Sequence, residues 1–271
     1  MDFKQFLKDF RVRTGYDFCD YSENSISRRL QKISEESGLS FEQMLDKVVG
    51  DESFKNKVID DITVNTTELF RDPVMWVGLY KTLYKQLPKS AVLTFWHVGC
   101  SVGLEVYSNL IMMHQLGLLD KCRTIGTDLN PRVLSVARRG EYAYKFNMYF
   151  KDNFDAVMEG CGLDAKFEDY FDVDEAHDKM TVKPFLRENP KFFVQNLVQD
   201  RAPFPYKVDV VFIRNVMIYF NDKLQNHIMG MISSKMYDGA ALILGKQESL
   251  TVQMSTRFTK CGQYYQKKVQ N

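Results

Sequence analysis

Several absences in the sequence limit what this protein can be. The chain of 271 residues has five scattered cysteines and no Cys-x-x-Cys pair, so we expect reduced thiols in a cytoplasmic protein rather than a disulfide framework. Its histidines lack metal-ligand spacing, so we expect no metal site. No apolar run approaches the roughly 20 residues of a membrane span. The N-terminal segment MDFKQFLKDFRVR lacks the unbroken apolar stretch of a signal peptide.

The chain also lacks an excess of either charge. Its 36 basic and 35 acidic residues leave a formal net charge of +1, which gives no overall attraction to nucleic acid or to an anionic membrane. The composition, 45% hydrophobic and 26% charged, is ordinary for a globular protein. We therefore expect neither nucleic-acid binding nor membrane insertion, and the length allows one large domain or two unequal ones.

What the sequence does contain is a nucleoside-binding pattern. The apolar run in 92–98 ends at Gly99, and Gly103 then precedes a helical pattern with Glu105 in its first turn. A second apolar run ends at Asp128, where an acidic residue of a βαβ unit accepts hydrogen bonds from a ribose and has few structural duties. The glycine spacing is not G-x-G-x-x-G, and a carboxylate at a helix N-terminus would repel a pyrophosphate. Because that carboxylate suits a cationic amine, the pattern favours S-adenosylmethionine (SAM) over NAD.

The remaining pattern predicts an α/β fold behind a helical N-terminal region. Residues 1–61 show helical periodicity, with Ser40 as an N-cap and Gln43 as its capping-box partner. The near-continuous apolar run within 208–214 is typical of a strand buried on both faces, hence of a parallel sheet. The segment 142–190 interrupts the alternation, and we interpret it as an insertion with its own small structure. The predicted strands are 92–98, 123–128, 191–197, 208–214, 240–245 and 263–268, and the predicted helices are 103–116, 131–139 and 222–236.

Two polar segments fall where ligands bind in such folds. The segment 65–73 is rich in Asn, Thr, Glu and Arg and lies at the seam between the two regions. Arg214 and Asn215 directly follow a buried strand, where an arginine needs a partner or a ligand. Ligands of open α/β sheets bind beyond the carboxyl ends of the strands, which places Arg214, Asn215 and Tyr219 near Asp128. A helix cap with a surface turn explains the first segment equally well, and Tyr219 could instead be a core aromatic.

Five segments match motifs of one known family. Residues 65–71 read NTTELFR, 99–108 read GCSVGLEVYS, 127–130 read TDLN, 196–197 read NL and 213–220 read IRNVMIYF. Together they resemble the motifs N-x-T-x-F-F-R, A-C-S-T-G-E-E-P-Y-S, T-D-I-D, N-L and C-R-N-V-M-I-Y-F of the chemotaxis receptor methyltransferases, the CheR family. The resemblance covers nearly the whole chain, and the last motif is long and specific.

The resemblance implies a class I SAM-dependent methyltransferase with a Rossmann-like, mostly parallel seven-stranded sheet. It implies an all-α N-terminal domain at 1–64 and a methyltransferase domain at 65–271, with a small inserted β-subdomain at about 142–190. SAM would be the cofactor and S-adenosylhomocysteine (SAH) the product. The implied cofactor contacts are Asn65, Thr67, Arg71, Glu105, Asp128, Asn196, Leu197 and Arg214, to which the glycine turn adds Gly99 and Gly103. The residues implied around the transferred methyl are Arg71 and Tyr219.

The implied acceptors are glutamate side chains in the cytoplasmic helical region of chemoreceptors. A basic patch of Arg28, Arg29 and Lys32 would steer that acidic region, although an ordinary solvated face explains the patch as well. We expect a monomer. Some family members bind a receptor pentapeptide through a glycine-containing loop, and the counterpart 174–179 has no glycine.

Other departures from the family motifs leave alternatives open. Leu104 and Val106 replace the first Glu and the Pro of the E-E-P motif, Asn130 replaces the second Asp of T-D-I-D, and 245–248 reads GKQE instead of G-H-S-E. The alternatives are a catalytically silent SAM-binding or receptor-binding module and a methyltransferase with a different acceptor.

Overall fold

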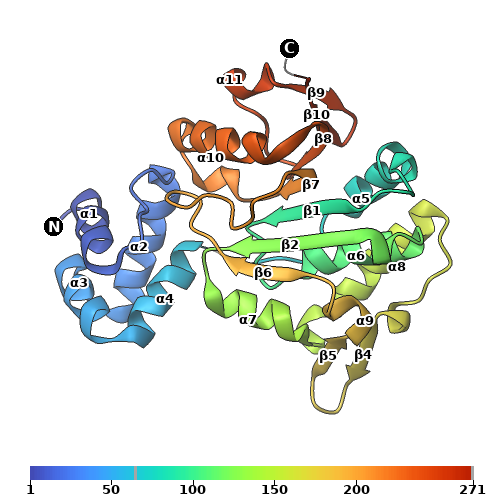
Figure 1. Cartoon of the computed structure of the whole chain (residues 1–271). Coiled ribbons are helices and arrows are strands. Elements are labelled where there is room, and N and C mark those ends of the chain that lie inside the picture. The colour runs from blue at the N-terminus through green and yellow to red at the C-terminus, as the bar shows by residue number, and fades with distance from the viewer. Residues whose placement is uncertain (64–65, 270–271) are drawn as a thin grey trace.

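Two β-sheets form the frame of the computed structural model, which describes residues 1–63 and 66–269. The larger sheet has seven strands in the order β6-β2-β1-β7-β8-β10-β9 (Figure 1). In that order the strands are Lys191–Val194, Cys122–Asp128, Leu93–Val98, Val208–Ile213, Met236–Leu244, Tyr264–Lys267 and Phe258–Cys261. Strands β6 to β8 pair in parallel, whereas β10 pairs antiparallel with β8 and β9. This sheet confirms the predicted α/β fold.

Helices cover both faces of the large sheet because its central strands are apolar on both sides. Phe95 and Phe212 pack into a core shared with helices α5 to α8. Their neighbours in the strands, Trp96 and Val211, point to the opposite face and pack into a second core with α10. The bounds are α5 Pro73–Thr82, α6 Leu104–Gln115, α7 Pro131–Arg139, α8 Tyr149–Cys161 and α10 Asp222–Lys235. The shorter helices are α9 Pro184–Arg187 and α11 Val252–Ser255.

The N-terminal region forms four helices around a core of its own. They are α1 Phe3–Thr14, α2 Glu23–Ser37, α3 Phe41–Gly50 and α4 Glu52–Thr63, and Phe6, Leu30 and Met44 are among their fully buried side chains. The predicted capping box is confirmed, since the side chains of Ser40 and Gln43 each bond to the other's backbone N–H. These helices lie beyond the carboxyl ends of strands β1 and β2 (Figure 1).

The segment predicted as an insertion contains the smaller sheet and helix α8. Strands β3 (Glu141–Ala143), β5 (Lys179–Val182) and β4 (Phe171–Asp174) form the antiparallel sheet. Helix α8 lies between β3 and β4 in the chain, yet its buried Phe150 and Phe154 join the main core. Phe171, Met180 and Val182 of the small sheet join the same core, so the segment has a sheet of its own but no separate core.

Two predicted strand limits differ from the structure for local reasons. The strand predicted at 191–197 ends at Val194, because a turn begins in which Asp200 accepts from the backbone N–H of Asn196. The strand predicted at 240–245 begins earlier, at Met236, and the helix before it ends at Lys235. The apolar pattern does not indicate this start, because the pairing of β8 with β7 is irregular there and residues 237–239 are exposed.

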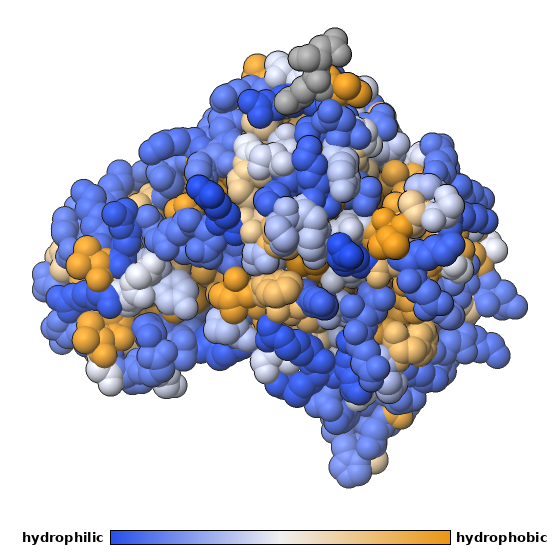
Figure 2. Space-filling model, viewed as in Figure 1, coloured by the Kyte–Doolittle hydropathy of each residue, from blue (hydrophilic) through white to orange (hydrophobic). Residues whose placement is uncertain are grey.

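The surface agrees with the composition. Hydrophilic residues cover most of the face in Figure 2, and hydrophobic ones gather in small separate patches. Within residues 1–63 and 66–269, none of the helices is both long and apolar enough to cross a membrane.

Candidate active site

One pocket lies at the carboxyl ends of four parallel strands. Gly99 directly follows β1, Asp128 ends β2, Asn196 follows β6 closely, and Arg214 directly follows β7. The predicted site residues that line this pocket are Thr67, Arg71, Gly99, Glu105, Asp128, Asn196, Leu197, Arg214 and Tyr219. Gly103 is not among the lining residues, and Asn65 lies outside the described residues. The carboxyl ends of the parallel strands thus bring together side chains that are far apart in the sequence.

The glycine turn has two different close approaches. Gly99 has a φ of +68°, and a Cβ there would lie 2.5 Å from Cγ2 of Val216, so this glycine lets the segment after β7 approach the turn. Gly103 has a φ of +87°, and a Cβ there would lie 2.9 Å from the Cβ of Ala137 in α7. The second glycine therefore serves the packing of α6 against α7.

Asp128 lines the pocket and connects the turn after β1 to the turn after β2. Its Oδ2 accepts a hydrogen bond from the Ser101 N–H at 2.8 Å, and its Oδ1 accepts one from the Asn130 N–H at 3.0 Å. The expectation that this carboxylate has few structural duties is wrong, because it holds both loops. Burial raises the pKa of Asp128, and these backbone donors offset part of that rise.

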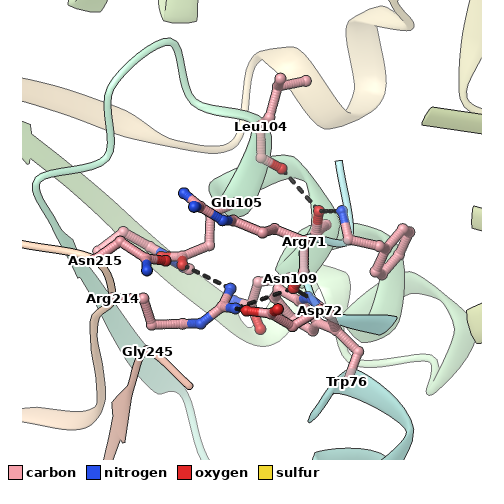
Figure 3. Close-up of polar contacts among 12 residues, drawn as sticks. Arg71, Asp72, Trp76, Leu104, Glu105, Asn109, Arg214, Asn215 and Gly245 are labelled. Carbon is pink, nitrogen blue, oxygen red and sulfur yellow. Dashed lines mark hydrogen bonds and ion pairs between the residues drawn. The ribbon is translucent and has the colours of Figure 1, made fainter. Parts of the chain in front are cut away.

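Glu105 belongs to a buried network of charges (Figure 3). Its Oε1 lies 2.9 Å from Nδ1 of His97, and its Oε2 lies 3.2 Å from Nη1 of Arg214. Nη2 of Arg214 is 2.7 Å from the Asp72 carboxylate, so the predicted need of this arginine for partners is confirmed. Burial alone would raise the pKa of Glu105, but the His97 hydrogen bond and the Arg214 charge outweigh it and hold that pKa below its ordinary value. Two carboxylates, those of Asp72 and Glu105, thus flank one guanidinium.

Comparison with known proteins identifies the origin of this arrangement. Residues 1–63 match the family model of the CheR methyltransferase all-alpha domain, and residues 65–266 match that of the CheR methyltransferase SAM-binding domain. The chain belongs to the CheR methyltransferase family. It is a SAM-dependent methyltransferase of class I fold.

Curated relatives cover nearly the whole chain. Cher3 of Pseudomonas putida, a candidate methyltransferase, is 28% identical over 251 residues, which span 92% of this chain and 89% of that protein. The chemotaxis protein methyltransferase 1 of Pseudomonas aeruginosa is 28% identical over 92% of this chain and 90% of its own length. The chemotaxis protein methyltransferase of Vibrio parahaemolyticus is 28% identical over 92% and 88%.

The pocket fits the cofactor of the CheR family. Glu105 and Asp128 offer acceptors for an ammonium group and for ribose hydroxyls. The side-chain Oε1 of Gln195, a pocket-lining residue only 2% exposed, is a buried acceptor without a hydrogen-bond partner. No cluster of three or more His, Cys, Asp or Glu side chains that could hold a metal occurs in the part of the chain that the structure describes.

Arg71 and Tyr219 line the same pocket as Glu105 and Arg214. Arg71 donates to the Thr66 carbonyl at 3.4 Å, and its own carbonyl accepts from Arg214 at 3.0 Å. Tyr219 is half-buried, and its ring lies 4.6 Å from the guanidinium carbon of Arg29 in α2. This exposure argues against a purely core role for Tyr219.

Some lining residues could not be found by motif reasoning alone. Tyr21 comes from the loop before α2, and its ring contacts Phe220 edge-on at a centroid distance of 4.9 Å. No pattern in the sequence indicates that this loop reaches the pocket. The other unassigned lining residues are Thr63, Thr66, Cys100, Ser101, Thr127, Leu129, Gln195, Val216 and Phe220, whereas Asn215 lines the pocket as its place after the buried strand predicted. Several of these, such as Thr66 and Ser101, lie within the motif segments, so the motif residues beside them were the available indication that they line the pocket.

Proposed function

We propose that this CheR-family enzyme transfers the methyl group of SAM to glutamate side-chain carboxylates in the helical cytoplasmic region of chemoreceptors. The observation that carries the proposal is the meeting of Arg71 and Tyr219 with the carboxylates Glu105 and Asp128 around one pocket. The names of the Pseudomonas aeruginosa and Vibrio relatives, chemotaxis protein methyltransferases, support the same acceptor class.

The cofactor would be held by groups already ordered in the pocket. Each oxygen of Glu105 accepts one contact in the network, and a carboxylate has about four acceptor positions, so room remains for a ligand ammonium group. Asp128 has the same spare capacity for ribose hydroxyls. Thr67, Asn196, Leu197 and Arg214 complete the proposed contacts, and Asn65 stays a prediction from the family motif. When bound, SAM supplies a methyl group activated by the sulfonium.

The proposed reaction needs alignment rather than a base. A glutamate carboxylate, with a reference pKa of about 4.3, is ionised at neutral pH. One carboxylate oxygen forms the new bond to the methyl carbon while the carbon–sulfur bond breaks, leaving a neutral ester and a neutral thioether. Arg71 would orient the acceptor carboxylate and Tyr219 would donate a hydrogen bond to it. Such positioning can contribute roughly 7–11 kcal/mol.

The orienting arginine has a limit on how tightly it can bind. A strong clamp on the acceptor would stabilise the ground-state anion more than the transition state, in which the negative charge is being neutralised. Arg71 has no carboxylate partner in the ion pairs of the described residues, and its contact to Thr66 is long. Its side chain is therefore available to orient an incoming carboxylate.

The decisive experiment is the transfer of labelled methyl groups from SAM into cognate receptor membranes. We expect label that is released by mild base, as a methyl ester is. A folded protein that binds SAH but transfers no label would support the catalytically silent module. Base-stable label would indicate a different acceptor atom.

A further inference from the structure

One carboxylate outside the pocket collects an unusual number of backbone donors. Glu248 lies in the turn after β8, and its Oε2 accepts from the N–H of Asn215 at 2.7 Å and of Gly245 at 2.7 Å. Its Oε1 accepts from the N–H of Val216 at 2.9 Å, of Met217 at 2.8 Å and of Ile218 at 3.3 Å. Four consecutive amides of the segment 215–218 therefore converge on a single side chain.

The segment that Glu248 binds leads directly into Tyr219. Asn215 has a φ of +59°, a left-handed conformation that is uncommon for non-glycine residues, although asparagine adopts it more readily than most. The short helix Met217–Tyr219 then follows, and Asn215, Val216 and Tyr219 all line the pocket. The conformation of this segment therefore sets the position of the Tyr219 backbone, from which the side chain extends.

The neighbouring residues indicate that this contact is specific. A Cβ at Gly245 would lie 2.6 Å from Oε2 of Glu248 and 2.9 Å from the backbone nitrogen of Asn215, so a glycine is needed for the approach. Among the ion pairs of the described residues, none involves Glu248. The partial positive charges of the converging amides therefore act as its counter-charge, as in an anion-binding nest.

We propose that Glu248 is a positioning residue for methyl transfer: it orders the segment 215–218 and so holds the Tyr219 hydroxyl where the acceptor carboxylate reacts. The inference rests on the proposed function for its kinetic consequence, but the ordering of the segment is measurable without it. Arg214 precedes the segment and is held by Asp72 and Glu105. Cofactor affinity should therefore depend on Glu248 much less than turnover does.

The test compares Glu248→Gln with Glu248→Asp, and uses Glu159→Gln, at an exposed position of α8, as the matched control. The glutamine keeps the size but replaces one acceptor oxygen with an N–H donor that opposes the backbone donors, whereas aspartate keeps the charge. We expect faster amide hydrogen exchange at 215–218 in Glu248→Gln. We expect its kcat to fall by about 100-fold, the loss that a small misplacement of a reacting group produces, with SAH affinity changed less than about threefold. Aspartate should restore part of both losses.

A double-mutant cycle with Tyr219→Phe separates positioning from general damage. If Glu248 acts through Tyr219, removing the hydroxyl should cost less in the Glu248→Gln background than in the wild type. Fully multiplicative effects, unchanged exchange at 215–218, or an equal loss of SAH affinity and turnover would each overturn the inference. If the wild type transfers no methyl group, the proposed function fails, and the exchange experiment still decides whether Glu248 orders the segment.

Discussion

At the scale of single residues, the site depends on carboxylates that serve the protein and the ligand together. Asp128 holds two loops through backbone N–H groups, and Glu105 holds Arg214 and His97. The protein shifts the pKa values of the two carboxyl groups in opposite directions. Burial raises the pKa of Asp128, whereas His97 and Arg214 lower that of Glu105 against the effect of its burial. The family motif alone could identify both residues but not this difference.

Replacing Asp128 should therefore have two consequences. Asp128→Ala should weaken SAH binding by about 1–3 kcal/mol through loss of charge-assisted hydrogen bonds. It should also loosen the two loops, because the N–H groups of Ser101 and Asn130 lose their acceptor. Calorimetry measures the first effect and amide exchange the second, with Asp120→Ala, at an exposed site, as the control. Unchanged SAH affinity would contradict the proposed cofactor contact.

Replacing Tyr219 should affect the rate rather than cofactor binding. A hydroxyl that contacts the acceptor mainly in the reacting complex contributes to kcat, so Tyr219→Phe should lower turnover more than it lowers SAH affinity. Single-turnover methyl transfer and SAH titration measure the two quantities. Equal losses would place the hydroxyl in the cofactor-binding group instead.

The low pKa of Glu105 predicts how acid affects the fold. Because its folded-state pKa lies below the ordinary value of 4.5, Glu105 adds stability above that value, and the contribution disappears as the pH falls through the folded-state pKa. Asp128, with a raised pKa, acts in the opposite direction. Glu105→Gln should thus be less stable near neutral pH and should lose less further stability on acidification. Parallel melting-temperature curves for both proteins below pH 4.5 would contradict this.

At the scale of elements, the strand–turn–helix units were predictable and their irregular neighbours were not. Runs of apolar residues fix β1, β2 and β7 to within one residue, because strands buried on both faces leave a continuous signal. The early start of β8 could not be predicted, since the exposed residues 237–239 lie where its pairing with β7 is irregular. The role of Glu248 could not be predicted either, because four of its five partners are backbone amides some thirty positions away.

The glycine turn allows a matched test of close approach. Gly99→Ala should be more damaging than Gly117→Ala, because both glycines have φ near +68° but only Gly99 has a neighbour, Val216, within 4 Å of the added methyl. The shared left-handed conformation should cost about 1–2 kcal/mol, and the clash should add about 1–3 kcal/mol at Gly99. Denaturant unfolding and SAH titration of both variants give the comparison. Equal losses at the two positions would show that the approach of Val216 is unimportant.

At the scale of the whole molecule, the helical N-terminal region completes the site. The Ser22 N–H donates to the Tyr219 carbonyl at 2.7 Å, and Tyr21 forms a β-bridge with Phe220. A second contact between the two regions joins Asp60 in α4 to Arg132 in α7, whose charged groups lie 2.6 Å apart. Sequence motifs located both regions but could not show that they meet here, because the contacts depend on tertiary packing.

The basic patch on α2 divides into two kinds of residue in the structure. Arg29 is half-buried, stacks on Tyr219 and donates to the Ile62 carbonyl, so reversing its charge would disturb the proposed catalytic residue directly. Arg28 and Lys32 are exposed beside it and line the same shallow depression. They are the positions at which charge can be changed without touching the pocket.

Reversal of Arg28 and Lys32 to glutamate therefore tests whether the patch attracts the acidic receptor. Electrostatic attraction should make the wild-type kcat/KM for receptor fall as salt rises, and the double variant should have a higher KM and a flatter salt dependence. Its SAH affinity should match that of the wild type, and its melting temperature should fall only slightly, because the exposed ion pair of Lys32 with Glu36 becomes a like-charge pair. A control pair on two other helices, Lys8 in α1 and Lys151 in α8, both changed to glutamate, alters the net charge equally. If both double variants behave alike, the patch acts only through overall charge; if only the α2 variant loses receptor affinity, this helix faces the acceptor.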